Sequence, residues 1–377
     1  MNARTLVIEE KLRDAGVGRT VRPSDFRLRD NGAIDPRIVL QNPNLTLYCL
    51  DFESREALFL ETPPDCDLTR VPFLYAAQYE SALRAVSVPF TLLDRLAEEV
   101  VIDPARLILI YSIGRCGSTL VSRAYAEAAN VESLSEPDVF TQLLGVWGYE
   151  GLDSKEKTDV VRNCTLLQCA PGKIKGANAW VFKFRSMVTE MWPLFYGAFP
   201  EARVVFLYRG NEPWARSFHR MMGSPDPSEP SPMAMLRYFF GRLTPRLEQL
   251  ESASALEIMA SMWLSVMEAC LAMKRAGLPL FIVRYEELNA APLDVLARMF
   301  AHSGLGADAV GNLSAVLAQD SQAGTQLSRD SLAEGGSRLT AEHLAELRRL
   351  IRAGSSVLTA DTEVPGTYFP GSGGSVA

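Results

Sequence analysis

One short stretch of the chain combines two glycines and two hydroxyl side chains in a spacing that suits anion binding. Residues 107–111 are apolar and rich in strand-forming types, which predicts a buried strand of a parallel sheet. The turn that follows holds Gly114 and Gly117, where backbone can approach a ligand closely. Ser118 and Thr119 then begin a helix, whose N-terminal N–H groups and partial positive charge favour phosphate or sulfate.

The cation of this turn lies inside it rather than at its end. A Walker A loop ends in Gly-Lys-Ser/Thr to hold a triphosphate and Mg²⁺, whereas here Gly117 is followed directly by Ser118. Arg115 supplies a planar fork of donors that can bind an oxyanion without a metal. A plain strand–helix turn is the alternative interpretation. Cys116, between Arg115 and Gly117, is expected to fill space, with a reactive thiol at a helix start as the alternative.

A second arginine–hydroxyl pair follows another apolar run. Arg209 comes directly after residues 203–208, and Ser217 lies eight positions further on. Pro213 suits the first turn of a helix, which places Ser217 one turn into that helix. An arginine at a strand end and a hydroxyl on the next helix can bind a second phosphate. The alternative is a solvated arginine and an unrelated serine.

The elements that must position these residues alternate between strand and helix. Strands are expected at residues 107–111, 131–138, 180–184, 203–208 and 279–285, and helices at 141–149, 155–170, 191–199, 213–220, 233–250, 256–275, 293–302 and 341–352. This order predicts an α/β fold with a parallel central sheet flanked by helices. Ligands of such sheets bind beyond the carboxyl ends of the strands, where the residues above are found.

The first hundred residues carry no motif with evident chemistry. Residues 45–51 and 57–61 predict a hairpin, and residues 75–101 predict helix interrupted near Pro89. We therefore divide the chain into an N-terminal appendage (1–101), a main α/β domain (102–365) and a flexible Gly/Ser-rich tail (366–377).

Composition limits the class of protein. The chain has 377 residues, is 47% hydrophobic and carries a net charge of −7, which argues against a broad nucleic-acid surface. Its six cysteines lack CxxC spacing and its histidines number three, so neither a disulfide scaffold nor a metal site is expected. Since neither a signal peptide nor a ~20-residue membrane span is evident, a cytoplasmic protein without membrane partners is expected.

Three motifs in this order resemble the sulfotransferases that use 3′-phosphoadenosine 5′-phosphosulfate (PAPS). The turn from Arg115 through Gly117, Ser118, Thr119 and Leu120 resembles the 5′-phosphosulfate loop of that superfamily. The Arg209…Ser217 pair is similar to its 3′-phosphate motif, spacing included. Val283-Arg284-Tyr285-Glu286-Glu287-Leu288 resembles a third segment, whose tyrosine lies by the nucleotide in several members. The likeness spans residues 106–305 and is closer to the bacterial, Golgi-type and protein-tyrosine branches than to the cytosolic phenol/steroid branch.

The resemblance implies a P-loop-like sulfotransferase fold and a cofactor set of PAPS without a metal. Gly114 to Leu120, Arg209, Ser217 and Tyr285 would bind the nucleotide. Lys183 stands where the tyrosine-sulfating branch carries a lysine that stabilises the leaving group; a lysine that only reaches water is the alternative.

Attack by the acceptor also needs a base. Glu136 occupies the position of the family's glutamate base, and a carboxylate in an apolar cleft can serve as one. His219 and Asp138 are the alternatives.

Two further segments have alternative roles. Ser321 and Arg329 lie in a polar segment that can cover a ligand or merely connect helices, and residues 335–338 can replace a C-terminal motif of the phenol/steroid branch. The expected reaction is sulfuryl transfer to a hydroxyl or amine of a small or medium-sized acceptor. A P-loop kinase or nucleotide hydrolase, and a non-catalytic nucleotide-binding protein of the same fold, are the alternatives.

Overall fold

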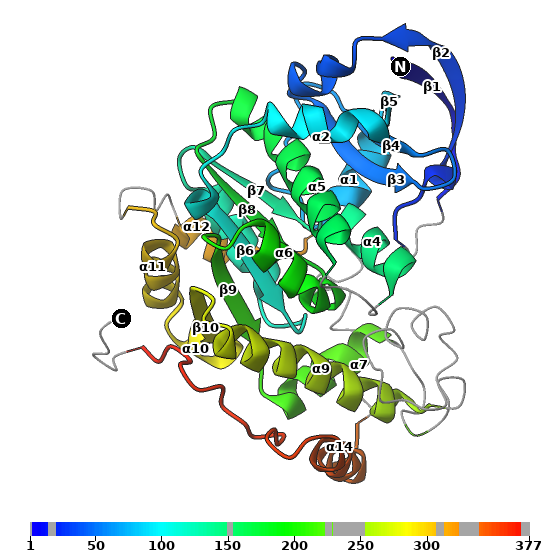
Figure 1. Ribbon diagram of the computed structural model, residues 1–377. Helices are drawn as coiled ribbons and strands as arrows, with labels where there is room; N and C mark the ends of the chain where they lie inside the picture. Colours follow the sequence, from blue (N-terminus) through cyan, green and yellow to red (C-terminus); the bar gives the residue numbers. More distant parts are fainter. Residues whose placement is uncertain are drawn as a thin grey trace. The chain divides into compact units, whose positions relative to one another are not determined.

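The computed structural model describes residues 2–13, 20–148, 154–222, 228, 253–306, 313–323 and 339–370 (Figure 1). The chain forms two compact units. Unit 1 comprises Met1–Leu109 and Ala128–Ala202, and unit 2 comprises Ile110–Glu127 and Arg203–Ala377. The chain therefore passes from one unit to the other within the strand that precedes the glycine turn. The domain limits at residues 101 and 365 stay predictions.

A five-stranded sheet carries the elements predicted for the α/β fold. Its strands are β6 (Leu107–Ser112), β7 (Val131–Ser135), β8 (Ala179–Lys183), β9 (Arg203–Tyr208) and β10 (Leu280–Arg284), in the order β10-β9-β6-β8-β7. The pairs β7/β8 and β9/β10 are parallel, the first with Ser135 opposite Lys183 and the second with Arg284 opposite Tyr208. Nearly every residue of these strands is buried, as expected when helices cover both faces. The predicted α/β fold class is confirmed.

Unit 1 also holds an antiparallel sheet that the sequence shows only in part. Its strands are β1 (Ala3–Lys11), β2 (Phe26–Ile34), β3 (Leu45–Asp51), β4 (Glu56–Glu61) and β5 (Arg84–Pro89), in the order β2-β1-β5-β4-β3. The predicted β3/β4 hairpin is confirmed. The helix expected over residues 75–101 is wrong in its middle. Helices α1 (Leu74–Ser81) and α2 (Phe90–Glu98) flank strand β5, because Val86 and Val88 pair with β4.

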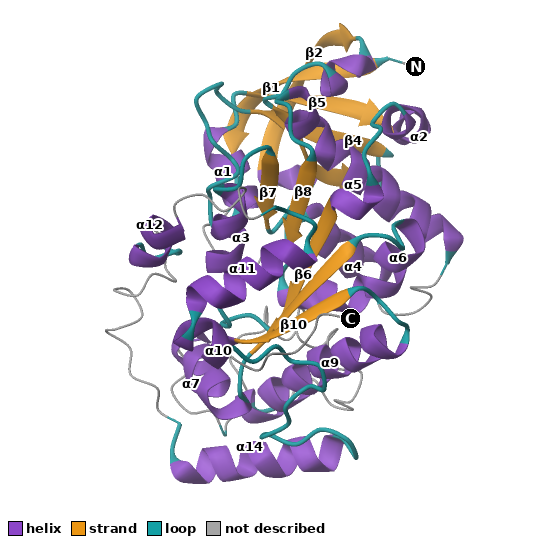
Figure 2. Ribbon diagram, turned by 90° about the vertical axis from the view of Figure 1, so that its left-hand side faces the viewer, coloured by secondary structure: helices purple, strands orange, loops and turns teal. Residues whose placement is uncertain are grey.

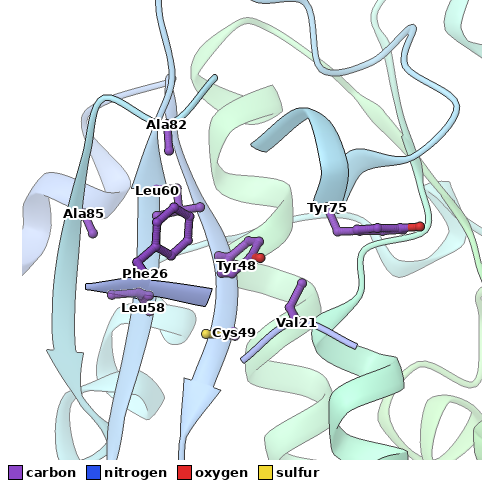
Figure 3. Close-up of a cluster of buried hydrophobic side chains, with 9 residues drawn as sticks. All are labelled: Val21, Phe26, Tyr48, Cys49, Leu58, Leu60, Tyr75, Ala82 and Ala85. Atoms are coloured by element: carbon purple, nitrogen blue, oxygen red, sulfur yellow. The ribbon is translucent and has the colours of Figure 1, made fainter. Parts of the chain in front are cut away.

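An apolar cluster fills the space between this sheet and its neighbours (Figure 3). Its residues are Val21, Phe26, Tyr48, Cys49, Leu58, Leu60, Tyr75, Ala82 and Ala85. The strands alternate so that one face of the sheet supplies most of this cluster. Tyr75 comes from α1 and Val21 from the segment before β2, so the cluster joins the sheet to segments that lie outside it.

The remaining helices of unit 1 follow the parallel strands. They are α4 (Val139–Trp147), α5 (Lys155–Ile174) and α6 (Trp192–Ala198), each near its predicted place. Ser154 begins α5 by accepting a hydrogen bond from the backbone N–H of Lys157. Helix α5 packs against β3, α2 and α6.

Unit 2 contains the helices that follow β6, β9 and β10. They are α3 (Ser118–Ala126), α7 (Asn211–Met222), α9 (Ala255–Arg275), α10 (Tyr285–Ala290), α11 (Pro292–His302), α12 (Leu313–Ala318) and α14 (Ala341–Gly354). Helix α14 packs along α9 (Figure 2). The helix predicted over residues 233–250 lies outside the described residues. Residues 366–370 of the predicted tail lie within them, and the backbone N–H of Tyr368 donates to the Ile282 carbonyl of β10 at 2.9 Å.

Helix α9 is long and apolar enough to span a membrane by length and composition, contrary to the expectation that the chain holds no such span. Within the described residues it is the one helix that passes this test, and 78% of its apolar window is buried inside the protein. Buried core helices pass the same test, so cytoplasmic placement stays a prediction.

Candidate functional site

The glycine turn of unit 2 has the strand–turn–helix form predicted for it. Gly114, Arg115 and Gly117 all adopt positive φ angles of 72°, 53° and 81°. Gly117 is the last residue before α3, so the first N–H groups of that helix border the turn. Positive φ is costly for arginine, and such strain is concentrated at functional sites.

Gly117 is favoured by a close contact as well as by its φ angle. A Cβ atom at this position would lie 3.2 Å from Cδ2 of Tyr285 and 3.2 Å from Cδ2 of Leu288. Both residues belong to α10, directly after β10. The third sequence motif therefore packs against the first.

The two predicted anion-binding motifs are joined by hydrogen bonds. Arg115 Nε donates to Ser217 Oγ at 3.3 Å, and Arg209 Nη1 donates to the backbone carbonyl of Arg115 at 3.2 Å. Arg209 follows β9, and Ser217 lies in α7 as Pro213 suggested. We call Arg115, Arg209 and Ser217 the anion clasp.

Arg209 is held in place by an aromatic ring and by its own backbone. Its guanidinium carbon lies 4.5 Å from the centroid of the Tyr285 ring, and its carbonyl accepts a hydrogen bond from Trp263 Nε1 at 3.5 Å. Its Nε atom is buried and has no hydrogen-bond partner among the described residues. A buried donor without a partner is unfavourable unless a ligand satisfies it.

The electrostatics of the clasp favour a negative ligand. Burial lowers the pKa of Arg115, and the nearby charges of Arg209 and Arg220 lower it further. Among the described residues, the Arg115 guanidinium donates to uncharged groups, Ser217 Oγ and Gln322 Oε1, the latter at 3.0 Å. An oxyanion bound between Arg115 and Arg209 would therefore relieve their mutual repulsion.

The other turn residues line the start of α3. Cys116 is fully buried and its thiol donates to the Leu207 carbonyl at 3.5 Å, which favours the space-filling interpretation. Ser118 and Thr119 are buried in the first turn of α3, and Leu120 is half-buried.

Unit 1 places Glu136 and Lys183 in direct contact. Lys183 Nζ lies 2.5 Å from Glu136 Oε1, and the backbone N–H of Glu136 donates to the Lys183 carbonyl at 2.6 Å. The parallel pairing of β7 with β8 brings the two residues together, because each stands at the carboxyl end of its strand. Glu136 has a φ of 59°, a strained value for a residue with a side chain.

A second cation completes this cluster. Arg185 Nε lies 3.4 Å from Glu136 Oε2 and 3.0 Å from Asp138 Oδ1. We call Glu136, Lys183, Arg185 and Asp138 the Glu136 cluster. Burial opposes the charge of Arg185, but Asp138, Tyr75 and Glu136 outweigh it and raise the pKa of the guanidinium.

The candidates for the base differ in their surroundings. The Asp138 side chain is wholly buried and its Oδ2 accepts a hydrogen bond from the Val21 backbone N–H at 2.9 Å. Burial raises the pKa of Asp138 although Arg185 opposes the change. His219 is buried in α7 of unit 2. The Glu136 side chain is 13% exposed and is therefore more accessible than that of Asp138.

Comparison with known proteins gives structural matches only. Neither a family model nor a curated protein sequence matches the chain. The solved structures that resemble it include bacterial sulfotransferases. STF9 from Mycobacterium avium is 14% identical with a TM-score of 0.44, over 72% of this chain and 82% of that chain. STF1 from Mycobacterium tuberculosis is 16% identical with a TM-score of 0.37, over 70% and 82%. A sulfotransferase from Alicyclobacillus acidocaldarius is 15% identical with a TM-score of 0.37, over 67% and 96%.

Sequence reasoning missed Arg185, Tyr75 and Gln322. Arg185 carries a detectable signal, because it lies two positions after Lys183 at the end of the same strand. Tyr75 and Gln322 carry none, since their roles depend on long-range packing. Ser321 is half-buried beside Gln322, whereas Arg329 and residues 335–338 lie outside the described residues.

A metal centre finds no support in the part of the chain that the structure describes. Within it, no group of three or more His, Cys, Asp or Glu side chains is placed to hold a metal ion. The expectation that catalysis needs no metal stays a prediction.

Proposed function

We propose that this chain is a sulfotransferase that moves a sulfuryl group from PAPS to a hydroxyl or amine of a small or medium-sized acceptor. The observation that carries the proposal is the anion clasp. Two arginines from separate motifs are linked through the Arg115 backbone, and Ser217 lies within hydrogen-bonding distance of one of them. A bisphosphorylated nucleotide supplies the two anionic groups that such a pair can bind.

The residues present fit PAPS. Arg115 and the N–H groups at the start of α3 would hold the 5′-phosphosulfate, and Arg209 with Ser217 would hold the 3′-phosphate. The buried, unpartnered Nε of Arg209 provides a donor for that phosphate. Tyr285 would border the nucleotide through its contact with Arg209. When bound, PAPS supplies the sulfuryl group.

The Glu136 cluster supplies the proton chemistry of the proposal. Glu136 accepts the proton of the acceptor hydroxyl or amine at its carboxylate. Lys183 provides the positive charge for the leaving oxygen, and in the structure its Nζ contacts Glu136 Oε1. Both residues stand at the carboxyl ends of parallel strands, where ligands of such sheets bind.

The proposed setting is the cytoplasm. The six cysteines are all free, and all but Cys66 are buried. Burial raises the pKa of Cys164 to about 12, so this thiol stays protonated and unreactive.

Thermal unfolding with added nucleotide tests the proposal. Adenosine 3′,5′-bisphosphate should raise the melting temperature, because a ligand of the native state stabilises it by mass action. Arg115→Ala and Arg209→Ala should abolish the shift. Arg216→Ala is the control, since Arg216 lies on α7 next to Ser217 but pairs with Glu212.

The result also separates the alternatives. Stabilisation by ATP and Mg²⁺ alone would replace the proposal with a kinase or hydrolase. Binding of the bisphosphate without any transfer from ³⁵S-labelled PAPS to acceptor libraries would indicate a non-catalytic nucleotide-binding protein.

A further inference from the structure

The ring of Tyr75 lies between two guanidinium groups of unit 1. The guanidinium carbon of Arg185 is 4.3 Å from the ring centroid, and that of Arg13 is 4.7 Å away. Tyr75 is 5% exposed and belongs to the apolar cluster of the antiparallel sheet (Figure 3). Cation–π contacts gain strength when both partners are removed from water, so the buried ring stabilises the positions of both guanidinium groups.

Arg185 connects that ring to Glu136. Its side chain is 8% exposed, and its Nε lies 3.4 Å from Glu136 Oε2 and 3.0 Å from Asp138 Oδ1, as ion pairs without hydrogen-bond geometry. Lys183 contacts the other oxygen of Glu136, Oε1. The carboxylate is therefore contacted at both oxygens by two cations, which restricts its rotation.

The N-terminal residues hold the other ends of this arrangement. The backbone N–H of Val21 donates to Asp138 at 2.9 Å. Arg13 donates to the Tyr48 hydroxyl at 3.0 Å, and that hydroxyl donates to Asp25 at 2.6 Å. Residues before β3 are thus connected to Glu136 by two indirect routes. Val21 binds Asp138, which contacts Arg185, and Arg13 lies over the Tyr75 ring, which also contacts Arg185.

We propose that Arg185, clamped between Tyr75 and Asp138, is a positioning residue for Glu136, and that residues 1–101 serve the reaction through this clamp. The inference rests on the proposed function, in which Glu136 takes the acceptor proton. A base displaced by about 1 Å loses on the order of 100-fold in rate, so a loosened Arg185 should lower kcat. Nucleotide binding depends on other residues and should be unaffected.

Tyr75→Leu and Tyr79→Leu form a matched pair for the test. Both tyrosines lie in α1, and each has a cation over its ring. For Tyr79 that cation is Lys11, with Nζ 5.8 Å from the ring centroid. Of the two rings, only that of Tyr75 contacts Arg185. Arg185→Lys is the second variant, because it keeps the charge but removes the planar fork.

Two readouts are needed, and the first is independent of enzymatic activity. Hydrogen exchange of the Arg185 side-chain Nε–H is followed by NMR, with the signal assigned by its loss in Arg185→Lys. We expect exchange roughly 10-fold or more slower than at exposed arginines in the wild type, and a return toward their rate in Tyr75→Leu. Tyr79→Leu should leave the Arg185 signal unchanged.

The second readout compares kcat with nucleotide affinity. With an acceptor from a ³⁵S-PAPS library screen, Tyr75→Leu and Arg185→Lys should lower kcat by about 10- to 100-fold. Affinity for adenosine 3′,5′-bisphosphate should stay within about twofold of the wild type, a change of no more than about 0.4 kcal/mol. Tyr79→Leu should keep both values.

Either of two results overturns the positioning role. One is fast exchange of the Arg185 Nε–H in the wild type. The other is a kcat for Arg185→Lys that equals the wild-type value. This measurement can be made even if Tyr75→Leu does not fold. A wild-type protein that protects Arg185 but does not bind the bisphosphate contradicts the proposed function and leaves the clamp intact, so the two failures are distinguishable.

Discussion

The guanidinium of Arg209 stacks on the ring of Tyr285, with 4.5 Å between the guanidinium carbon and the ring centroid. The Cδ2 atom of the same ring would lie 3.2 Å from a Cβ atom added at Gly117. One side chain after β10 thus contacts both the arginine after β9 and the glycine turn after β6. The anion clasp is consequently fixed by packing as well as by hydrogen bonds.

Replacing the Tyr285 ring should weaken nucleotide binding. Tyr285→Leu removes the cation–π contact that orients Arg209, worth about 0.5–2 kcal/mol, or roughly 2- to 30-fold in affinity for adenosine 3′,5′-bisphosphate. Tyr285→Phe keeps a ring and should retain most of that affinity. Calorimetric titration measures both variants, and equal losses for Phe and Leu would show that the ring does not act on Arg209.

A methyl group at Gly117 should damage the turn more than the same change elsewhere in unit 2. Gly117→Ala combines the cost of a positive φ angle, about 1–2 kcal/mol, with contacts on Tyr285 and Leu288. Gly277→Ala is the control, because Gly277 has a φ of 76° and no atom within 4 Å of the added methyl group. Chemical denaturation compares their free energies of unfolding. Equal losses would mean that the close contact contributes nothing.

The parallel-sheet elements could be predicted because local pattern decides them. An apolar run such as residues 203–208 indicates a buried strand without knowledge of its tertiary contacts. Pro213 limits where the next helix begins. The glycine turn was equally predictable at Gly114 and Gly117, because glycine tolerates the positive φ angles found there, whereas residue type gives no signal for the positive φ angle of Arg115.

The N-terminal sheet could not be predicted in the same way. Strand β1 is largely half-buried or exposed, with charged residues such as Glu9 that pair across the ladder with Arg29. Strand β5 is short and lies between two helices, so the apolar pattern of residues 75–101 was interpreted as helix interrupted only near Pro89. The contacts of Tyr75 with Arg185 join residues more than one hundred positions apart, which no local pattern encodes.

Stability should depend on pH through Glu132 of β7. Burial of this carboxyl group raises its pKa from 4.5 to about 8. The folded protein therefore binds more protons than the unfolded chain between these values, and stability falls as pH rises through that window. The slope for this group is about 1.4 kcal/mol per pH unit.

Glu132→Gln should remove that slope, because glutamine cannot ionise. Its advantage over the wild type should grow from pH 5 to about pH 8. The exposed Glu98→Gln in α2 is the control and should leave the slope unchanged. Urea unfolding at several pH values gives the free energies, and a wild-type curve parallel to that of Glu132→Gln would refute this role of Glu132.

The central claim is that Arg209 and Ser217 bind a 3′-phosphate beside a 5′-phosphate group at Arg115. Calorimetric titration of adenosine 3′,5′-bisphosphate against adenosine 5′-monophosphate tests it most directly, because the two ligands differ by that one phosphate. We predict roughly 10- to 150-fold tighter binding of the bisphosphate to the wild type and to Arg216→Ala, and a ratio near one in Arg209→Ala. Equal affinities of the wild type for both nucleotides, or a preference that survives in Arg209→Ala, would contradict the claim.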